Sequence, residues 1–123
     1  MRNVPEVRAP RIVAAMMAAG IWIAAEICAA STPSATECAE GAEFIGNAAR
    51  ARDTGTTREA FLDRMQSDFF AIRSFPNEQR WFAHDEADEA FLLGAARDIF
   101  DRPEDPDRHR IGFFRACMSR LTA

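Results

Sequence analysis

The fold is decided by the stretch SATECAEGAEFIGNAARARDTG, residues 34–55. Ser34 and Glu37 have the spacing of a capping box and predict a helix over residues 37–53. Gly55 follows it as a residue that readily takes the left-handed conformation in which many helices end. One face of this helix repeats with a period near 3.6 and carries Cys38, Ala42, Ile45, Ala48, Ala49 and the stem of Arg52.

Three more helices are expected. Thr56 and Glu59 repeat the capping-box spacing and predict a second helix that runs to about Arg73, before Pro76. Its apolar face carries Phe61, Met65, Phe69 and Ile72, with Leu62 beside them.

Asn77 can cap a third helix that runs to about Phe100. The acidic segment 84–89 leaves open whether this helix is continuous or consists of two pieces. Asp105 as N-cap and Pro106 at the first helical position predict the last helix. Its expected apolar stripe is Ile111, Phe114, Cys117, Met118 and Leu121.

The N-terminal segment has the layout of a secretory signal peptide. Three arginines precede an uncharged run over residues 12–25, and small residues follow to Ala30. The run is short of the ~20 residues that span a bilayer. An uncleaved membrane anchor and a cytoplasmic helix remain alternatives. We expect a signal peptide over residues 1–30, a disordered lead over 31–36 and one helical domain over 37–123, located in the periplasm or secreted.

Two cleavage sites are open, after Ala25 or after Ala30. The first leaves Cys28 in the product and an odd number of cysteines, so cysteine arithmetic favours the second. Cys38 and Cys117 then lie on the apolar faces of the first and last helices. In an oxidising compartment we expect them to form a disulfide, so that the fold is an all-α bundle of about four helices with one staple.

The charge balance argues against nucleic acid as a partner. Removing residues 1–30 removes three arginines and two glutamates, which leaves 12 arginines against 17 acidic residues. A chain with a net charge near −5 lacks the basic face that binds a phosphate backbone.

The order of several residues resembles that of small exported bacterial proteins of unassigned function. These residues are Cys38, Gly41, Ala48, Ala49, Arg52, Asp53, Gly55, Ile99, Phe100, Pro103, Pro106 and Cys117. The resemblance covers about 38–55 and 99–117, and it departs at Phe100, where the aromatic residue is often Tyr, and in a longer, Phe-rich middle segment. It implies a helical fold and export, and it transfers no catalytic residues.

Residues 84–89, His-Asp-Glu-Ala-Asp-Glu, are the one cluster that suggests a ligand set. His84 and Asp88 would share a helix face, but a metal site needs more convergent ligands than one helix supplies. We expect a solvated acidic face, no metal and no cofactor. His109 stands between Arg108 and Arg110, two cations that would lower its pKa. No catalytic motif is recognised in the sequence, and we expect a protein that is not an enzyme.

Arg52 and Asp53 stand at the predicted C-terminus of the first helix, where the helix dipole favours Arg and disfavours Asp. We interpret the pair as a structural clamp. Asp53 would cap the next turn through Thr56 or Thr57, or pair with an arginine of a neighbouring helix.

Aromatic residues are numerous, with ten Phe and two Trp. Adjacent pairs cannot both be buried on one helix face. We therefore expect some of Phe70, Phe75, Trp81 and Phe113 to be partly exposed. These four residues form a candidate partner patch. The sequence favours an exported interaction or cell-envelope accessory protein that binds a protein partner or self-associates, with membrane contact only if the N-terminal segment is retained. The alternatives are an immunity-type inhibitor of a secreted toxin, or a small periplasmic metal-binding protein or hydrolase using His84 and Asp88.

Overall fold

The first helix, α1 (Ala35–Asp53), starts with the capping box that the sequence predicts. Ser34 Oγ accepts a hydrogen bond from the backbone N–H of Glu37 at 3.1 Å. Gly55 follows the helix with a φ of +106°. The structure is a computed structural model that describes residues 33–122, so the expected signal peptide and residues 31–32 lie outside it. Because α1 starts at Ala35, residues 35 and 36 belong to the helix and not to a disordered lead.

Two other helices start close to their predicted caps. α2 (Arg58–Ile72) is capped by Thr57, whose hydroxyl accepts from the N–H of Ala60, so the predicted cap at Thr56 is wrong by one residue. α4 (Pro106–Leu121) has Asp105 at its N-cap position and Pro106 in its first turn, although the Asp105 side chain makes no capping hydrogen bond.

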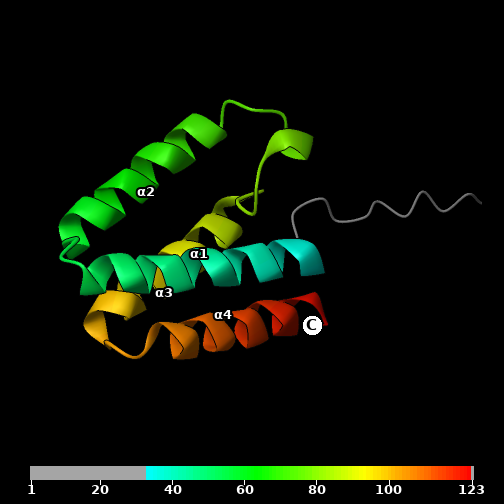
Figure 1. Cartoon of the computed structure of the whole chain (residues 1–123). Coiled ribbons are helices and arrows are strands. Elements are labelled where there is room, and N and C mark those ends of the chain that lie inside the picture. Colours follow the sequence, from blue (N-terminus) through cyan, green and yellow to red (C-terminus); the bar gives the residue numbers. More distant parts are fainter. Residues whose placement is uncertain (1–32, 123) are drawn as a thin grey trace, which may run out of the picture.

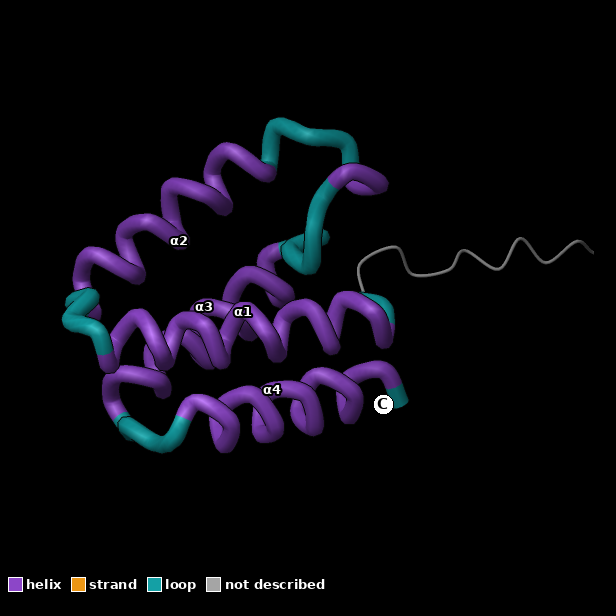
Figure 2. The backbone as a smooth tube through the Cα atoms, in the orientation of Figure 1, coloured by secondary structure: helices purple, strands orange, loops and turns teal. Residues whose placement is uncertain are grey.

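The predicted third helix is in fact two separate elements. A short 3₁₀ turn, η1 (Asn77–Gln79), is followed by an irregular segment over 80–85 and by α3 (Glu86–Asp101) (Figure 2). Asp85 caps α3 by accepting from the N–H of Asp88 at 2.8 Å. Within the irregular segment Phe82 has a φ of +56°, an uncommon backbone conformation for a bulky residue. This bend is what turns the Phe82 side chain into the core, where it is fully buried.

α1 and α4 lie side by side and antiparallel, with α3 behind them and α2 diverging from the group (Figure 1). The antiparallel register follows from two contacts: Cys38 is bonded to Cys117 at one end, and Arg50 lies 4.0 Å from Asp107 at the other. α2 runs antiparallel to α3, since Arg58 pairs with Asp101 and Arg73 with Glu89. Among residues 33–122 all regular elements are helical, which confirms the predicted all-α fold of four helices.

The core is built around an aromatic cluster of Phe82, Phe91 and Phe113, whose ring centroids are 5.3 to 6.3 Å apart. α1 approaches this cluster closely because it presents Gly41 there. A Cβ atom at Gly41 would lie 2.7 Å from Phe113 Cε1. The rest of the core consists of small and aliphatic side chains, including Ala42, Ile45, Ala48, Ala49, Leu92, Ala96 and Ile99.

The predicted apolar stripe of α4 is partly wrong. Phe113 and Cys117 are buried, whereas Ile111 and Phe114 are 42% and 39% exposed. The helix is rotated so that Phe113 can fill the space over Gly41, and this rotation turns its neighbour Phe114 outward. No helix in the described part of the chain is both long and apolar enough to cross a membrane.

Candidate functional site

The predicted disulfide is present. Cys38 and Cys117 are fully buried, and their Cα atoms are 5.6 Å apart. The bond joins the first turns of α1 to the last turns of α4 across 79 residues of sequence. Closing so long a loop stabilises a fold by about 4–5 kcal/mol in the chain-entropy account.

The Arg52 side chain hydrogen-bonds to backbone groups of distant segments. Its guanidinium donates from Nη1 to the carbonyl oxygen of Ile99 at 2.6 Å and from Nη2 to that of Glu104 at 2.8 Å. These bonds tie the end of α1 to the end of α3 and to the connection that leads into α4. Asp53 has a different role from the two that were expected: it accepts from Arg52 Nε and Nη2 at 3.0 and 2.8 Å and so orients the guanidinium.

The segment that suggested a metal site is engaged in holding the fold. His84 does not lie with Asp88 as a second ligand; its ring nitrogens contact Asn77 Oδ1 at 2.6 Å and Glu37 Oε2 at 2.8 Å. Glu37 also accepts from the backbone N–H of Phe82. Burial tends to raise the pKa of Glu37, but the hydrogen bonds from His84, Phe82 and Ser34 outweigh it and lower that pKa. The cluster fixes the irregular segment against the start of α1.

Asp88 and Glu89 are buried, so the expectation of a wholly solvated acidic face is wrong. Asp88 accepts from Arg120 Nη2 at 3.0 Å and from the N–H of His84 at 3.1 Å. Burial raises the pKa of Asp88, against the lowering effect of the His84 hydrogen bond and the Arg120 charge. Glu89 accepts two hydrogen bonds from the Arg73 guanidinium, at 2.6 and 2.8 Å. Within residues 33–122 no three His, Cys, Asp or Glu side chains are grouped so that they could hold a metal ion.

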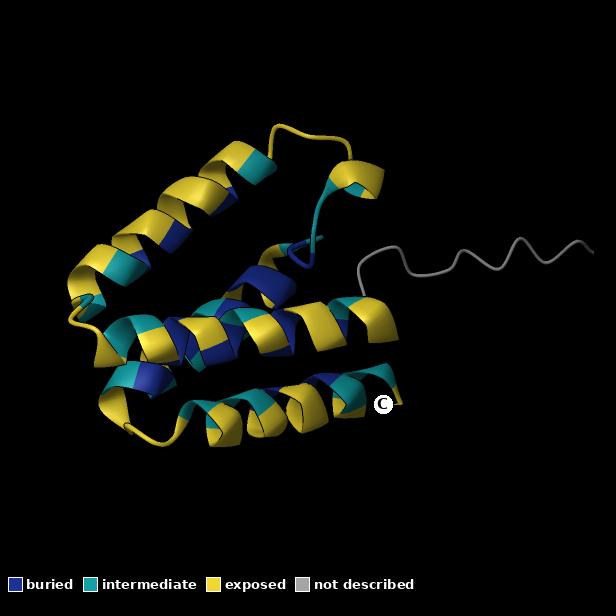
Figure 3. Ribbon diagram, viewed as in Figure 1, coloured by how far each residue is buried: buried dark blue, intermediate teal, exposed yellow. Residues whose placement is uncertain are grey.

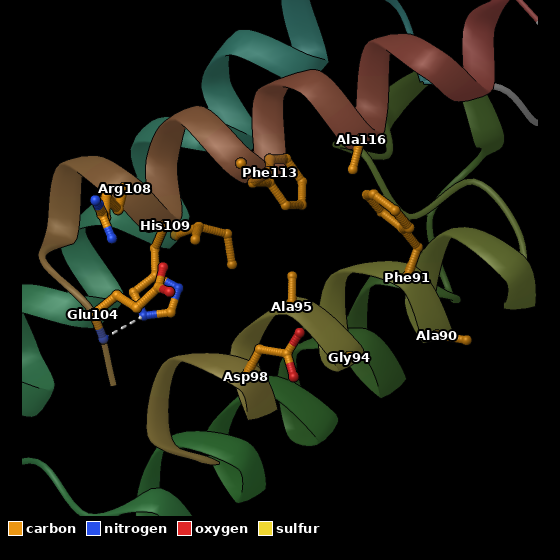
Figure 4. A pocket seen from close by; sticks show the side chains of 12 residues that line it. Ala90, Phe91, Gly94, Ala95, Asp98, Glu104, Arg108, His109, Phe113 and Ala116 are labelled. Atoms are coloured by element: carbon orange, nitrogen blue, oxygen red, sulfur yellow. Dashed lines mark hydrogen bonds between the residues drawn. The ribbon is translucent and has the colours of Figure 1, made fainter. Parts of the chain in front are cut away.

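A cleft of about 540 Å³ lies between α3 and α4 (Figure 4). Phe91 and Phe113 form its apolar end, and Asp98 and His109 approach its other end from opposite helices. His109 Nε2 accepts from the N–H of Glu104 at 3.1 Å, which requires that nitrogen to be unprotonated. Burial lowers the pKa of His109, and the charge of Arg52 lowers it further. The negative charges of Glu104 and Asp98 raise it by less. The lowering therefore comes mainly from burial and Arg52, and not from Arg108 and Arg110 as the sequence suggests.

The four residues of the candidate partner patch are not brought together. Phe113 is buried in the core and Trp81 is half-buried, its indole N–H donating to Glu40 Oε2 at 2.7 Å. Phe70 and Phe75 are 75% and 50% exposed, at and beyond the C-terminal end of α2. The surface of α2 in this region is largely exposed (Figure 3). We call Phe70 and Phe75 the exposed phenylalanine pair.

A shallow groove of about 470 Å³ between α2 and α3 includes Phe70 in its lining. Phe70, Arg73 and Leu93 line it together with the acidic side chains of Glu86 and Glu89. Asp63 and Phe70 together line a second hollow. Phe70 is therefore the most exposed of the four residues of the candidate partner patch, and its surroundings carry acidic side chains and Arg73.

Sequence reasoning missed a second apolar surface, formed by Ile111 and Phe114 on α4. Their spacing of three residues is typical of a buried helix face, and nothing in the sequence distinguished Phe114 from its buried neighbour Phe113. The chain has no match among protein-family models, curated proteins or solved structures.

Proposed function

We propose that the chain is an exported protein that acts by binding another protein through the exposed phenylalanine pair, and that it is not an enzyme. The N-terminal arginines and the uncharged run over 12–25 support export to the periplasm or the medium. The disulfide between Cys38 and Cys117 supports the same route, since such bonds persist in oxidising compartments.

The observation that carries the binding function is the exposure of Phe70. A ring that is 75% exposed removes little apolar area from water in the free protein. Burying it against a partner would contribute about 1.5–3 kcal/mol, and aromatic residues often dominate binding interfaces. By contrast, the two residues that suggested a ligand set, His84 and Asp88, are engaged in hydrogen bonds that hold the fold.

The chemistry around Phe70 indicates the kind of partner. Asp63 and Glu86 line the hollows that include Phe70, while Arg73 in the same groove is paired with Glu89. A complementary surface therefore combines an apolar pocket with basic residues at its rim. An immunity-type inhibitor that blocks the basic cleft of a secreted toxin has this arrangement, and so does an accessory protein that docks onto a basic envelope protein.

Site-specific photocrosslinking tests the proposal in cells that express the chain from its own first residue. A photoreactive phenylalanine analogue replaces Phe70 in one variant, and exposed Arg97 on α3 in the control. We expect a discrete adduct with a second protein at position 70, its loss in a Phe75→Ser background, and no such adduct at position 97. Equal adducts at both positions, or none at position 70, would overturn the proposal. An adduct of two copies of this chain would also overturn it.

A further inference from the structure

The outward face of α1 and α4 carries an apolar recess that the proposed function does not use. The recess measures about 490 Å³ and is formed by α1 and α4 alone. α1 contributes Ala39, Ala42 and Glu43, and α4 contributes Ile111, Phe114 and Arg115. Its two large apolar residues, Ile111 and Phe114, follow a core-like spacing yet remain about 40% exposed. We call this surface the α1/α4 face.

The two halves of the α1/α4 face differ in size. The α1 half carries small side chains, because alanines occupy positions 39 and 42. The α4 half carries large side chains, because Ile111 and Phe114 project from it. A partner that fits this face has large side chains above α1 and small ones above α4.

The two halves also differ in charge. Glu40 and Glu43 line the α1 side, and Arg110 and Arg115 line the α4 side. Arg110 makes two long ion pairs within its own chain, 3.8 Å from Glu43 Oε1 and 3.5 Å from Asp107 Oδ1. Arg115 makes no ion pair with any of residues 33–122. Glu40 is already engaged by Trp81, so Glu43 is the freer of the two acids.

We propose that two copies of this chain associate through the α1/α4 face about a two-fold axis parallel to the helices. Such a rotation lays α1 of one copy over α4 of the other, so each alanine recess receives the partner's Ile111 and Phe114. The same rotation keeps the height of each residue along the helices, so Glu43 faces the partner's Arg110. A two-fold axis perpendicular to the helices would instead set α1 on α1, with acid against acid and recess against recess. Size and charge therefore select the same axis independently.

The dimensions of the face set the expected strength. α4 has 16 residues and is about 24 Å long, and two adjacent helices are about 20 Å wide. The area of a face with these dimensions is small for a stable interface, because stable interfaces typically bury about 800 Å² on each partner. We therefore expect a weak dimer, which weakens further at high salt because its rim is charged.

Sedimentation equilibrium of the oxidised protein, expressed from its own first residue, tests the proposal up to about 200 µM, a range that spans a micromolar Kd. We expect a monomer–dimer equilibrium that Phe114→Asp weakens at least tenfold. The control, Arg97→Asp, introduces the same acidic side chain at an exposed position on α3, outside the face, and leaves the equilibrium unchanged. Circular dichroism of each variant verifies its helical fold, and Glu43→Arg supplies a second, surface-only disruption.

A charge swap tests the axis. The double variant Glu43→Arg with Arg110→Glu restores the dimer with itself and does not pair with the wild-type chain, because α1 over α4 then sets like charges together. Pairing between the swapped and wild-type chains would indicate the perpendicular axis and overturn the proposal. A wild-type chain that stays monomeric to about 200 µM, or equal effects of Phe114→Asp and Arg97→Asp, would overturn it as well. None of these outcomes bears on crosslinking at position 70, so the two proposals fail separately.

Discussion

The guanidinium of Arg52 reaches across 47 residues of sequence to donate to the carbonyl oxygen of Ile99 at 2.6 Å. Ile99 lies in the last turn of α3, where carbonyl groups have no helical partner. Arg52 also binds the carbonyl of Glu104, so one side chain satisfies two backbone groups in the connection between α3 and α4.

Replacing Arg52 should therefore loosen three helices at once. Arg52→Ala is expected to lower the free energy of unfolding by about 2–3 kcal/mol, because hydrogen bonds from a charged group are lost. The melting temperature should fall by roughly 10 °C. Arg52→Lys should recover little, since an ammonium group cannot supply the same fork of donors. Differential scanning calorimetry gives the melting temperature of each variant. The control is Arg97→Ala, which replaces an exposed arginine on α3. Equal melting temperatures for the Arg52 and Arg97 variants would contradict the clamp.

Replacing Gly41 or Gly94 with alanine should change the stability of the fold in opposite directions. At Gly41 the added Cβ would meet Phe113 at 2.7 Å and Phe82 at 3.2 Å, so Gly41→Ala should destabilise the fold by about 1–3 kcal/mol. At Gly94, in the middle of α3, the added Cβ meets nothing within 4 Å. Gly94→Ala should therefore stabilise by about 0.5–1 kcal/mol through helix propensity. Urea unfolding compares the stability of the two variants. A stabilising Gly41→Ala would contradict the close packing of α1 against the aromatic cluster.

The protonation of His109 should couple stability to pH. Its pKa in the folded protein is lowered by burial and by Arg52 from the ordinary value of 6.5. The unfolded chain then binds the proton more readily than the folded one, so stability is complete above pH 6.5 and falls as the pH drops below that value.

Unfolding by urea at pH 7.5 and 5.5 measures this effect. His109→Gln keeps an acceptor for the Glu104 N–H and removes the titration, so its stability should change less between the two pH values. NMR titration of the half-buried imidazole gives the pKa of His109 directly. A folded-state pKa above 6.5 would contradict the neutral, accepting ring.

The parts of the fold that the sequence predicts are those set by local signals. The Ser34–Glu37 capping box, Gly55 and Pro106 act within a few residues of themselves, and each marks a helix boundary in the structure to within two residues. The cysteine pair was predicted from compartment and position on apolar faces, which are also simple signals.

The parts that could not be predicted depend on distant partners. Asp88 is buried because Arg120, 32 residues away, neutralises it. The choice between Phe113 and Phe114 as the core residue depends on the space over Gly41, on another helix. The positive φ of Phe82 has no sequence signal, since that conformation is typical of glycine and asparagine.

The most direct test of the account is the intact mass of the protein released from cells that express it from Met1, measured with and without reductant. We expect a product that begins at Ser31 and is two hydrogens lighter before reduction than after it, with thiols that react with an alkylating agent only after reduction. A product that retains residues 1–30 and carries free thiols at Cys38 and Cys117 would contradict both export and the disulfide, on which the proposed function depends.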